Sequence, residues 1–145
     1  TARVPMVLKH FPKARFIFLN REPIDSIRSL VQVKQRMSGL VGLQPLPTEI
    51  TQVEDTVTAH RELIQAFETS RQLIPAGQLI EVNYADLIQQ PFAVVESIYE
   101  AFGLPSWSTA QAPIRQRIEQ SSTYRADPVA LEPLAEQRLR ELLGV

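Results

Sequence analysis

The sequence predicts an α/β domain in which a parallel sheet is flanked by helices and the C-terminal half is rich in helix. Two short apolar runs, Ala14–Leu19 and Gln78–Asn83, have the length and residue types of buried strands. Segments with the helical spacing of apolar residues lie between and after them. Because a long helical crossover joins the two strands, we expect a right-handed connection and a parallel pair.

The first element expected is the end of a helix, Arg3–His10, with Val4, Val7 and Leu8 on its apolar side. His10 falls in the last turn, where a histidine gains from the helix dipole. This position is at the amino end of the first strand, away from the edge where ligands bind. We therefore expect His10 to be structural and not a catalytic base.

A second helix is expected from Pro23 to about Met37, directly after the first strand. Proline suits the first helical position because its φ is already helical. Glu22 and Asp25 place negative charge at the helix start, as the dipole favours. We expect four apolar residues to face the core: Ile24, Ile27, Leu30 and Val31.

The turn between the first strand and this helix has the features of an anion site. Ligands of α/β proteins dock at the carboxyl end of the sheet, and the free N–H groups of a helix start favour an anion. Arg21 lies in the turn and presents a charged fork suited to phosphate. Ser29, eight residues later and about two turns along, lies on the same side. Alternatively, Arg21 pairs with Glu22 or Asp25 and Ser29 is an ordinary helix serine.

The longest helix is expected from Thr48 to about Ile74, with His60 and Arg71 on its apolar seam as half-buried structural residues. The second strand follows. Its parallel pairing with the first strand places Tyr84 at the same sheet edge as Arg21. Alternatively, Tyr84 is a strand-end core aromatic. The apolar seam of the long helix comprises Ile50, Val53, Val57, Ile64, Phe67 and Ile74.

Three further helices are expected in the C-terminal half. One begins at Pro91 and ends at Gly103-Leu104-Pro105, a glycine cap followed by proline. A second covers residues 112–120. The last runs from Leu131 to Leu143, with its apolar face formed by Leu131, Leu134, Leu139 and Leu142.

Two segments resemble the nucleotide-binding motifs of bacterial-type sulfotransferases that use 3′-phosphoadenosine 5′-phosphosulfate (PAPS). The run FPKARFIFLNREPIDSIRS, residues 11–29, is similar to the family's 3′-phosphate segment: an apolar strand, Arg-(Asp/Glu)-Pro, then Ser eight residues after the Arg. The run Tyr84-Ala85-Asp86-Leu87, with Pro91 after it, resembles the family's Tyr-Glu-Asp-Leu motif. The run IYEAFGLP resembles the helix that follows.

The resemblance implies a role for four residues. Arg21 and Ser29 would bind the 3′-phosphate of PAPS or of its product PAP, and Tyr84 would approach the adenine. Arg125, in a C-terminal basic loop, would be a second phosphate contact, or else an ordinary solvated arginine. Ala85 departs from the family pattern because it replaces the usual acid, which weakens the local hydrogen bonding expected around the tyrosine.

The resemblance covers residues 1–145 and implies a single domain that is the C-terminal portion of a P-loop-like sulfotransferase fold. The five glycines are scattered and form no glycine-rich loop for a diphosphate. In the family that loop, and a lysine and a histidine near the sulfate, lie upstream. We therefore expect no catalytic residue among these 145 and no activity from this chain alone.

Composition excludes several other functions. A net charge of −1 makes no case for nucleic acid or an anionic membrane as the main partner, so an anion site must be local. The chain has no cysteine, which excludes disulfides and thiolate metal sites, and two histidines leave little for zinc. No apolar run is long enough for a membrane span and no signal peptide is visible, so a cytoplasmic enzyme is expected.

The resemblance thus implies transfer of a sulfuryl group from PAPS to a hydroxyl or amine of a small-molecule, carbohydrate or peptide acceptor. A kinase-like nucleotide-binding protein of related fold is the first rival. It needs a Walker lysine loop and acidic magnesium ligands, which this sequence lacks. The second rival is a non-catalytic α/β interaction module, which would ignore nucleotide.

Overall fold

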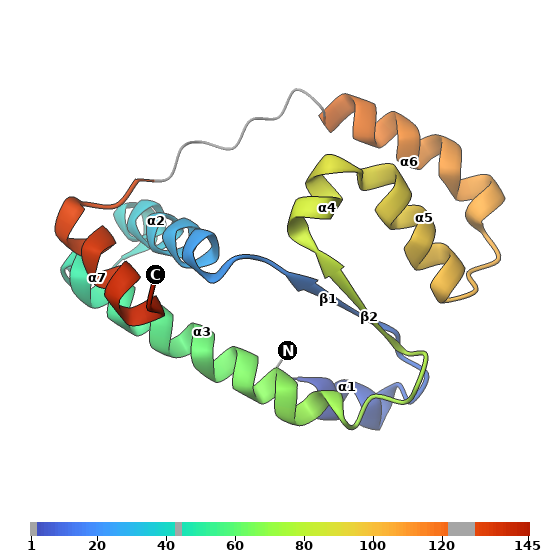
Figure 1. Cartoon of the computed structure of the whole chain (residues 1–145), viewed down its shortest axis with the longest axis horizontal. Coiled ribbons are helices and arrows are strands. Elements are labelled where there is room, and N and C mark those ends of the chain that lie inside the picture. The colour runs from blue at the N-terminus through green and yellow to red at the C-terminus, as the bar shows by residue number, and fades with distance from the viewer. Residues whose placement is uncertain (1–2, 43–44, 122–129) are drawn as a thin grey trace. The chain divides into compact units, whose positions relative to one another are not determined.

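The computed structural model describes residues 3–42, 45–121 and 130–145. The chain divides into two compact units, which we call the sheet unit (residues 2–21 and 70–126) and the helical unit (residues 22–69 and 127–145). In chain order (Figure 1) the elements are α1 Val4–His10, β1 Phe16–Asn20, α2 Pro23–Val41, α3 Glu49–Arg71, β2 Leu79–Asn83, α4 Tyr84–Gln89, α5 Pro91–Ala101, α6 Trp107–Ser121 and α7 Pro133–Leu143.

The sheet unit is built on a parallel pair of strands, as the sequence predicts. β1 and β2 pair along their whole length, from Phe16 opposite Leu79 to Asn20 opposite Asn83. Since the strands are parallel, both end at the same edge of the sheet. The helix-rich chain with its small parallel sheet confirms the predicted α/β class.

The prediction that β1 is a buried strand is wrong for one of its faces. Ile17 and Leu19 are 53% and 44% exposed, whereas Phe16 and Phe18, which alternate with them, are half-buried. A continuous apolar run is typical of a strand with both faces covered. In the described residues β1 belongs to a two-stranded sheet, and one of its faces stays open.

Helix α6 begins at Trp107, earlier than the predicted start of the 112–120 helix. The Trp107 ring packs against Phe92 and Tyr99, with ring centroids 5.4 and 5.0 Å apart. Its indole Nε1 donates a hydrogen bond to a carboxylate oxygen of Glu96, 3.1 Å away. These contacts with α5 anchor the first turn of α6, which periodicity alone does not reveal.

The helical unit has a core made by α2, α3 and α7. The predicted faces of α2 and α3 are confirmed at their centres and fail at the flanks, where Leu30, Ile50 and Ile64 are 45%, 36% and 37% exposed. The buried cluster comprises Ile27, Val31, Val53, Val57, Ala135 and Leu139.

The predicted face of the last helix is wrong at Leu134, which is 68% exposed. The stripe that reaches the core contains Ala135 and Leu139, both fully buried, and Leu142, which packs against the cluster. These positions follow i, i+4, i+7 spacing, and Leu134 falls beside them. Ala135 therefore occupies the core position that the sequence prediction assigned to Leu134.

A double hydrogen bond between the partly buried side chains of Arg28 and Glu136 links α2 to α7. The Arg28 Nε donates to one oxygen of Glu136 at 2.9 Å, and its Nη2 donates to the other oxygen. The side chains are 21% and 25% exposed. The hydrogen bonds from Arg28 lower the pKa of the Glu136 carboxyl, and the charge of Arg140 acts in the same direction.

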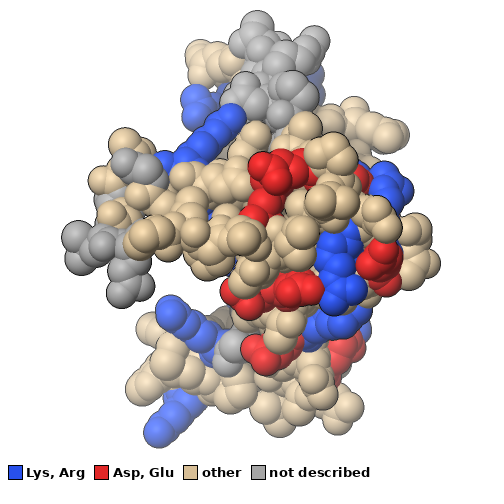
Figure 2. All heavy atoms as spheres, turned by 90° about the vertical axis from the view of Figure 1, so that its left-hand side faces the viewer, with Lys and Arg blue, Asp and Glu red and all other residues tan. Residues whose placement is uncertain are grey.

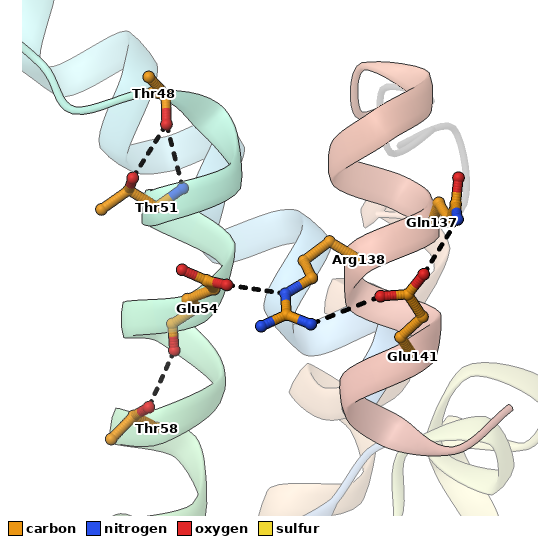
Figure 3. Close-up of polar contacts among 7 residues, drawn as sticks. All are labelled: Thr48, Thr51, Glu54, Thr58, Gln137, Arg138 and Glu141. Atoms are coloured by element: carbon orange, nitrogen blue, oxygen red, sulfur yellow. Dashed lines mark hydrogen bonds and ion pairs between the residues drawn. The ribbon is translucent and has the colours of Figure 1, made fainter.

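A second polar contact joins α7 to α3 on the unit's surface (Figure 3). The Arg138 Nε donates to a carboxylate oxygen of Glu54 at 2.7 Å, and its Nη1 reaches Glu141 at 3.4 Å. Figure 2 views the left-hand side of Figure 1 and shows basic and acidic residues interspersed there. Paired charges of this kind make this face electrostatically mixed.

The described residues contain neither a side-chain cluster suited to a metal ion nor a helix suited to crossing a membrane. They contain no group of three or more histidine, aspartate and glutamate side chains arranged to hold a metal ion. No described helix has both the length and the apolar character needed to cross a membrane.

Candidate functional site

Arg21 and Tyr84 follow the two strands directly, at the carboxyl edge of the sheet unit. The last paired residues are Asn20 and Asn83, so the next residue on each segment emerges at the same level. The guanidinium carbon of Arg21 lies 4.7 Å from the centroid of the Tyr84 ring. A cation at this distance from a ring face is attracted by the ring quadrupole. The structure therefore brings together the two residues that the sequence placed at one edge.

The contact leaves the hydrogen-bonding atoms of Arg21 available. A guanidinium has five N–H donors in a fixed fork, and a cation–π contact depends on its charge and not on a hydrogen bond. Among the described residues, no hydrogen bond or ion pair engages the Arg21 side chain. Both Arg21 and Tyr84 are half-buried. The attraction between the guanidinium and the ring is therefore screened less by solvent than it would be at a fully exposed site. The arrangement suits a planar or tetrahedral oxyanion that accepts two parallel hydrogen bonds.

Asn83 fixes the backbone on which Tyr84 sits, a role that the sequence analysis missed. Its side-chain oxygen accepts a hydrogen bond from the Ala85 amide, 2.8 Å away, and so caps α4. Asparagine is among the best N-cap residues, and its place just before a helical run is the signal that could have revealed it. Because the cap uses the backbone of Ala85, the missing acid at this position does not disturb it.

Ser29 lies in α2, within the helical unit, and is half-buried. The predicted start of this helix is confirmed, with Pro23 at its first position and Asp25 in the first turn. Asp25 pairs with Arg28 at 3.5 Å. No described hydrogen bond uses the Ser29 hydroxyl, which stays available to a ligand.

The sequence also predicts roles for Arg125, Arg71, His60 and His10. Arg125 lies outside the described residues, and its proposed phosphate contact stays a prediction. Arg71 forms an ion pair with Glu81 of β2, as a structural role requires. His60 is half-buried on α3, and His10 is exposed in the last turn of α1.

Arg15 is a natural counterpart of Arg21 at the opposite end of β1. Its guanidinium carbon lies 5.4 Å from the centroid of the Phe102 ring. Both arginines flank the same strand and both rest on an aromatic ring, yet only Arg21 is at the carboxyl edge. Arg15 therefore provides an internal comparison for the chemistry of Arg21.

The strand–turn–helix edge with its arginine defines an α/β protein that has a candidate anion site at the carboxyl end of its parallel strands. A model of the Sulfotransferase family matches residues 1–109, which is most of the chain. The chain belongs to this family. The two nucleotide-motif segments of the sequence both lie inside the matched residues.

Two named relatives agree with this assignment. The chain is 26% identical over 129 residues to the omega-hydroxy-beta-dihydromenaquinone-9 sulfotransferase Stf3 of Mycobacterium bovis and of Mycobacterium tuberculosis. The match covers 89% of this chain and 33% of the relative, so the chain spans about a third of the length of these curated relatives.

A solved structure has the same fold. The crystal structure of the sulfotransferase STF9 from Mycobacterium avium matches with a TM-score of 0.77 at 21% sequence identity. The match covers 99% of this chain and 38% of that one. At this identity the likeness concerns the fold alone, and it confirms the predicted α/β sulfotransferase fold.

Proposed function

We propose that this chain is the part of a PAPS-dependent sulfotransferase that holds the nucleotide by its 3′-phosphate and adenosine. Arg21 and Ser29 bind the 3′-phosphate, and Tyr84 contacts the adenosine. The observation that carries the proposal is the contact of the Arg21 guanidinium with the Tyr84 ring at the carboxyl edge of the parallel strands.

The chemistry of these side chains fits a phosphorylated nucleoside. The Arg21 fork donates two parallel N–H groups to two phosphate oxygens, and a charge-assisted pair of this kind is strong and directional. The Ser29 hydroxyl donates one further hydrogen bond. The Tyr84 ring supplies an apolar face for the adenosine and at the same time holds the guanidinium in place.

These contacts are remote from the reacting bond, and their effect on catalysis is one of positioning. PAPS supplies an activated sulfuryl group, which passes to the acceptor as the bond from sulfur to the 5′-phosphate oxygen breaks and PAP leaves. Binding energy from Arg21, Ser29 and Tyr84 holds the nucleotide in one orientation. Neither a general base for the acceptor proton nor a loop for the phosphosulfate is visible among the 145 residues. We therefore expect nucleotide binding, without transfer, from this chain alone.

The acceptor belongs to the same proposal. The Stf3 relatives are named for omega-hydroxy-beta-dihydromenaquinone-9, which favours a hydroxyl over an amine and a small molecule over a carbohydrate or peptide. The phosphate contact of Arg125 and the cytoplasmic location predicted from the sequence remain predictions.

Calorimetric titration with adenosine 3′,5′-bisphosphate and with AMP tests the proposal. The two ligands differ by the 3′-phosphate alone, so the expected preference for the bisphosphate measures the contacts of that group. Two charge-assisted hydrogen bonds are worth on the order of 1.5–3 kcal/mol, which is more than tenfold in affinity. Equal affinities for the two ligands would contradict the proposal, and the interaction-module alternative would then be preferred.

A further inference from the structure

The first 21 residues have a charge opposite to that of the rest of the chain. They contain five of the fifteen lysines and arginines, and the first acidic residue is Glu22. The net charge of −1 for the whole chain conceals this imbalance. A local basic segment produces a local positive potential whatever the overall charge is.

Helix α1 directs part of this charge to one face. Val4 is buried and Val7 and Leu8 are half-buried, so this side of α1 packs inward. The opposite side carries Arg3, Met6, Lys9 and His10, which follow the helical spacing i, i+3, i+6, i+7 and are all exposed. We call this side, together with the exposed Phe11 and Lys13 that follow it, the α1 face.

Two large apolar side chains of the same segment, residues 3–13, are exposed as well. Met6 is 53% exposed and Phe11 is 68% exposed. The backbone holds Phe11 in place, because its amide donates to the Val7 carbonyl at 2.7 Å and its carbonyl accepts from the Ala14 amide at 2.9 Å. Phe11 and Lys13 therefore project from a defined turn at the end of α1.

We propose that the α1 face binds the surface of a bilayer that contains anionic lipids. Lys9, Lys13 and Arg3 pair with lipid phosphates, while Phe11 and Met6 enter the boundary between headgroups and acyl chains. The combination of cations with exposed aromatic and thioether side chains is the chemistry of such surfaces. A nucleic acid would also attract the cations, but Met6 and Phe11 favour the bilayer because its boundary layer accepts apolar side chains.

This proposal does not depend on the proposed nucleotide site. Arg21 lies at the carboxyl end of β1, whereas the α1 face precedes the amino end of that strand. Arg15 also stands apart, because its guanidinium rests on the Phe102 ring. Loss of one function should therefore leave the other intact.

Co-sedimentation of the chain with lipid vesicles tests the proposal. We expect binding to phosphatidylcholine vesicles that contain phosphatidylglycerol, weaker binding as salt is raised, and none to pure phosphatidylcholine. Lys9→Ala and Lys13→Ala should each weaken binding about fivefold. Phe11→Ala should also weaken binding at constant charge, and circular dichroism shows whether each variant is folded.

Two matched controls separate the α1 face from the rest of the surface. Arg117→Ala removes an exposed arginine from α6, and Leu134→Ala removes an apolar side chain with the same 68% exposure as Phe11. Neither should alter vesicle binding. Equal losses in the lysine variants and in Arg117→Ala would overturn the proposal. So would binding to a DNA duplex that matches the vesicle affinity and is unaffected by Phe11→Ala, since the surface would then recognise polyanions in general.

Discussion

The guanidinium of Arg21 lies over the ring of Tyr84, although the two residues follow different strands. Their meeting depends on the parallel register, which ends with Asn20 opposite Asn83. The phenol ring attracts the charge of the arginine, and no hydrogen bond or ion pair among the described residues uses the Arg21 side chain. We therefore expect the two residues to bind the same ligand and to contact different parts of it.

Replacement of Tyr84 should weaken binding of every adenosine nucleotide. Tyr84→Ala removes both the adenosine contact and the support of Arg21, and a cation–π contact is worth about 0.5–2 kcal/mol. We expect AMP affinity to fall by about threefold to tenfold, and PAP affinity to fall further because only PAP has the 3′-phosphate that Arg21 binds. Tyr84→Phe keeps the ring face and should stay within about twofold of the wild type. Unchanged AMP affinity in Tyr84→Ala, measured by calorimetry, would exclude the adenosine role.

Replacement of Ser29 should affect the 3′-phosphate alone. Ser29→Ala removes one hydroxyl donor to a charged group, which costs about 1–1.5 kcal/mol, or roughly fivefold to tenfold in PAP affinity. AMP lacks the 3′-phosphate and should bind both proteins equally. A parallel loss of AMP affinity would show that the substitution disturbs α2 and does not remove a phosphate contact.

The ion pair between Arg28 and Glu136 should make the free energy of unfolding depend on pH in the acidic range. The pair lowers the native pKa of Glu136, so the unfolded state takes up the proton first as the pH falls. Its contribution is present above the ordinary glutamate pKa of 4.5 and is lost as the pH falls through the lower native value. Glu136→Gln should cost about 1–3 kcal/mol at neutral pH and flatten this acid dependence.

Urea unfolding at neutral pH and at progressively lower pH measures this effect. Glu62→Gln, at an exposed position on α3, is a suitable control and should change stability little. If Glu136→Gln and the wild type lose stability with acid to the same extent, the pair does not act as described.

Alanine substitutions at two leucines of α7 test the packing of the helical unit's core. Leu139 is fully buried and Leu134 is 68% exposed. Leu139→Ala should destabilise the chain by about 2–5 kcal/mol, because it leaves a cavity in the buried cluster that also contains Val31 and Val57. Leu134→Ala should stay within about 0.5 kcal/mol of the wild type. Similar shifts in the urea midpoint would contradict the observed packing of α7.

Local signals in the sequence were enough to predict the parallel strands and several helix boundaries, although α4 was not predicted and α2 continues past the expected Met37 to Val41. Pro23 lies at the first position of α2, and Gly103, with φ of +58°, ends α5 in the left-handed conformation that glycine adopts freely. These features depend on residues close together in the chain. The position of Arg21 and Tyr84 at one edge also followed, because parallel pairing alone requires it.

Features that depend on distant contacts were not predicted. The start of α6 at Trp107 depends on rings of α5, and the helix continues through Pro113 in its interior. The exposed face of β1 depends on the number of strands beside it, which an apolar run does not state. At the site, the contact of the Arg21 guanidinium with the Tyr84 ring was not predicted, because spacing places two residues at an edge without orienting their side chains.

The most direct test of the proposed nucleotide site compares Arg21→Ala with Arg15→Ala in PAP binding. Both variants remove an arginine that rests on an aromatic ring, from opposite ends of β1. We predict that Arg21→Ala lowers PAP affinity more than tenfold and abolishes the preference for PAP over AMP, while Arg15→Ala leaves both unchanged. If Arg21→Ala keeps the preference for PAP, or if the two variants lose it equally, Arg21 does not bind the 3′-phosphate.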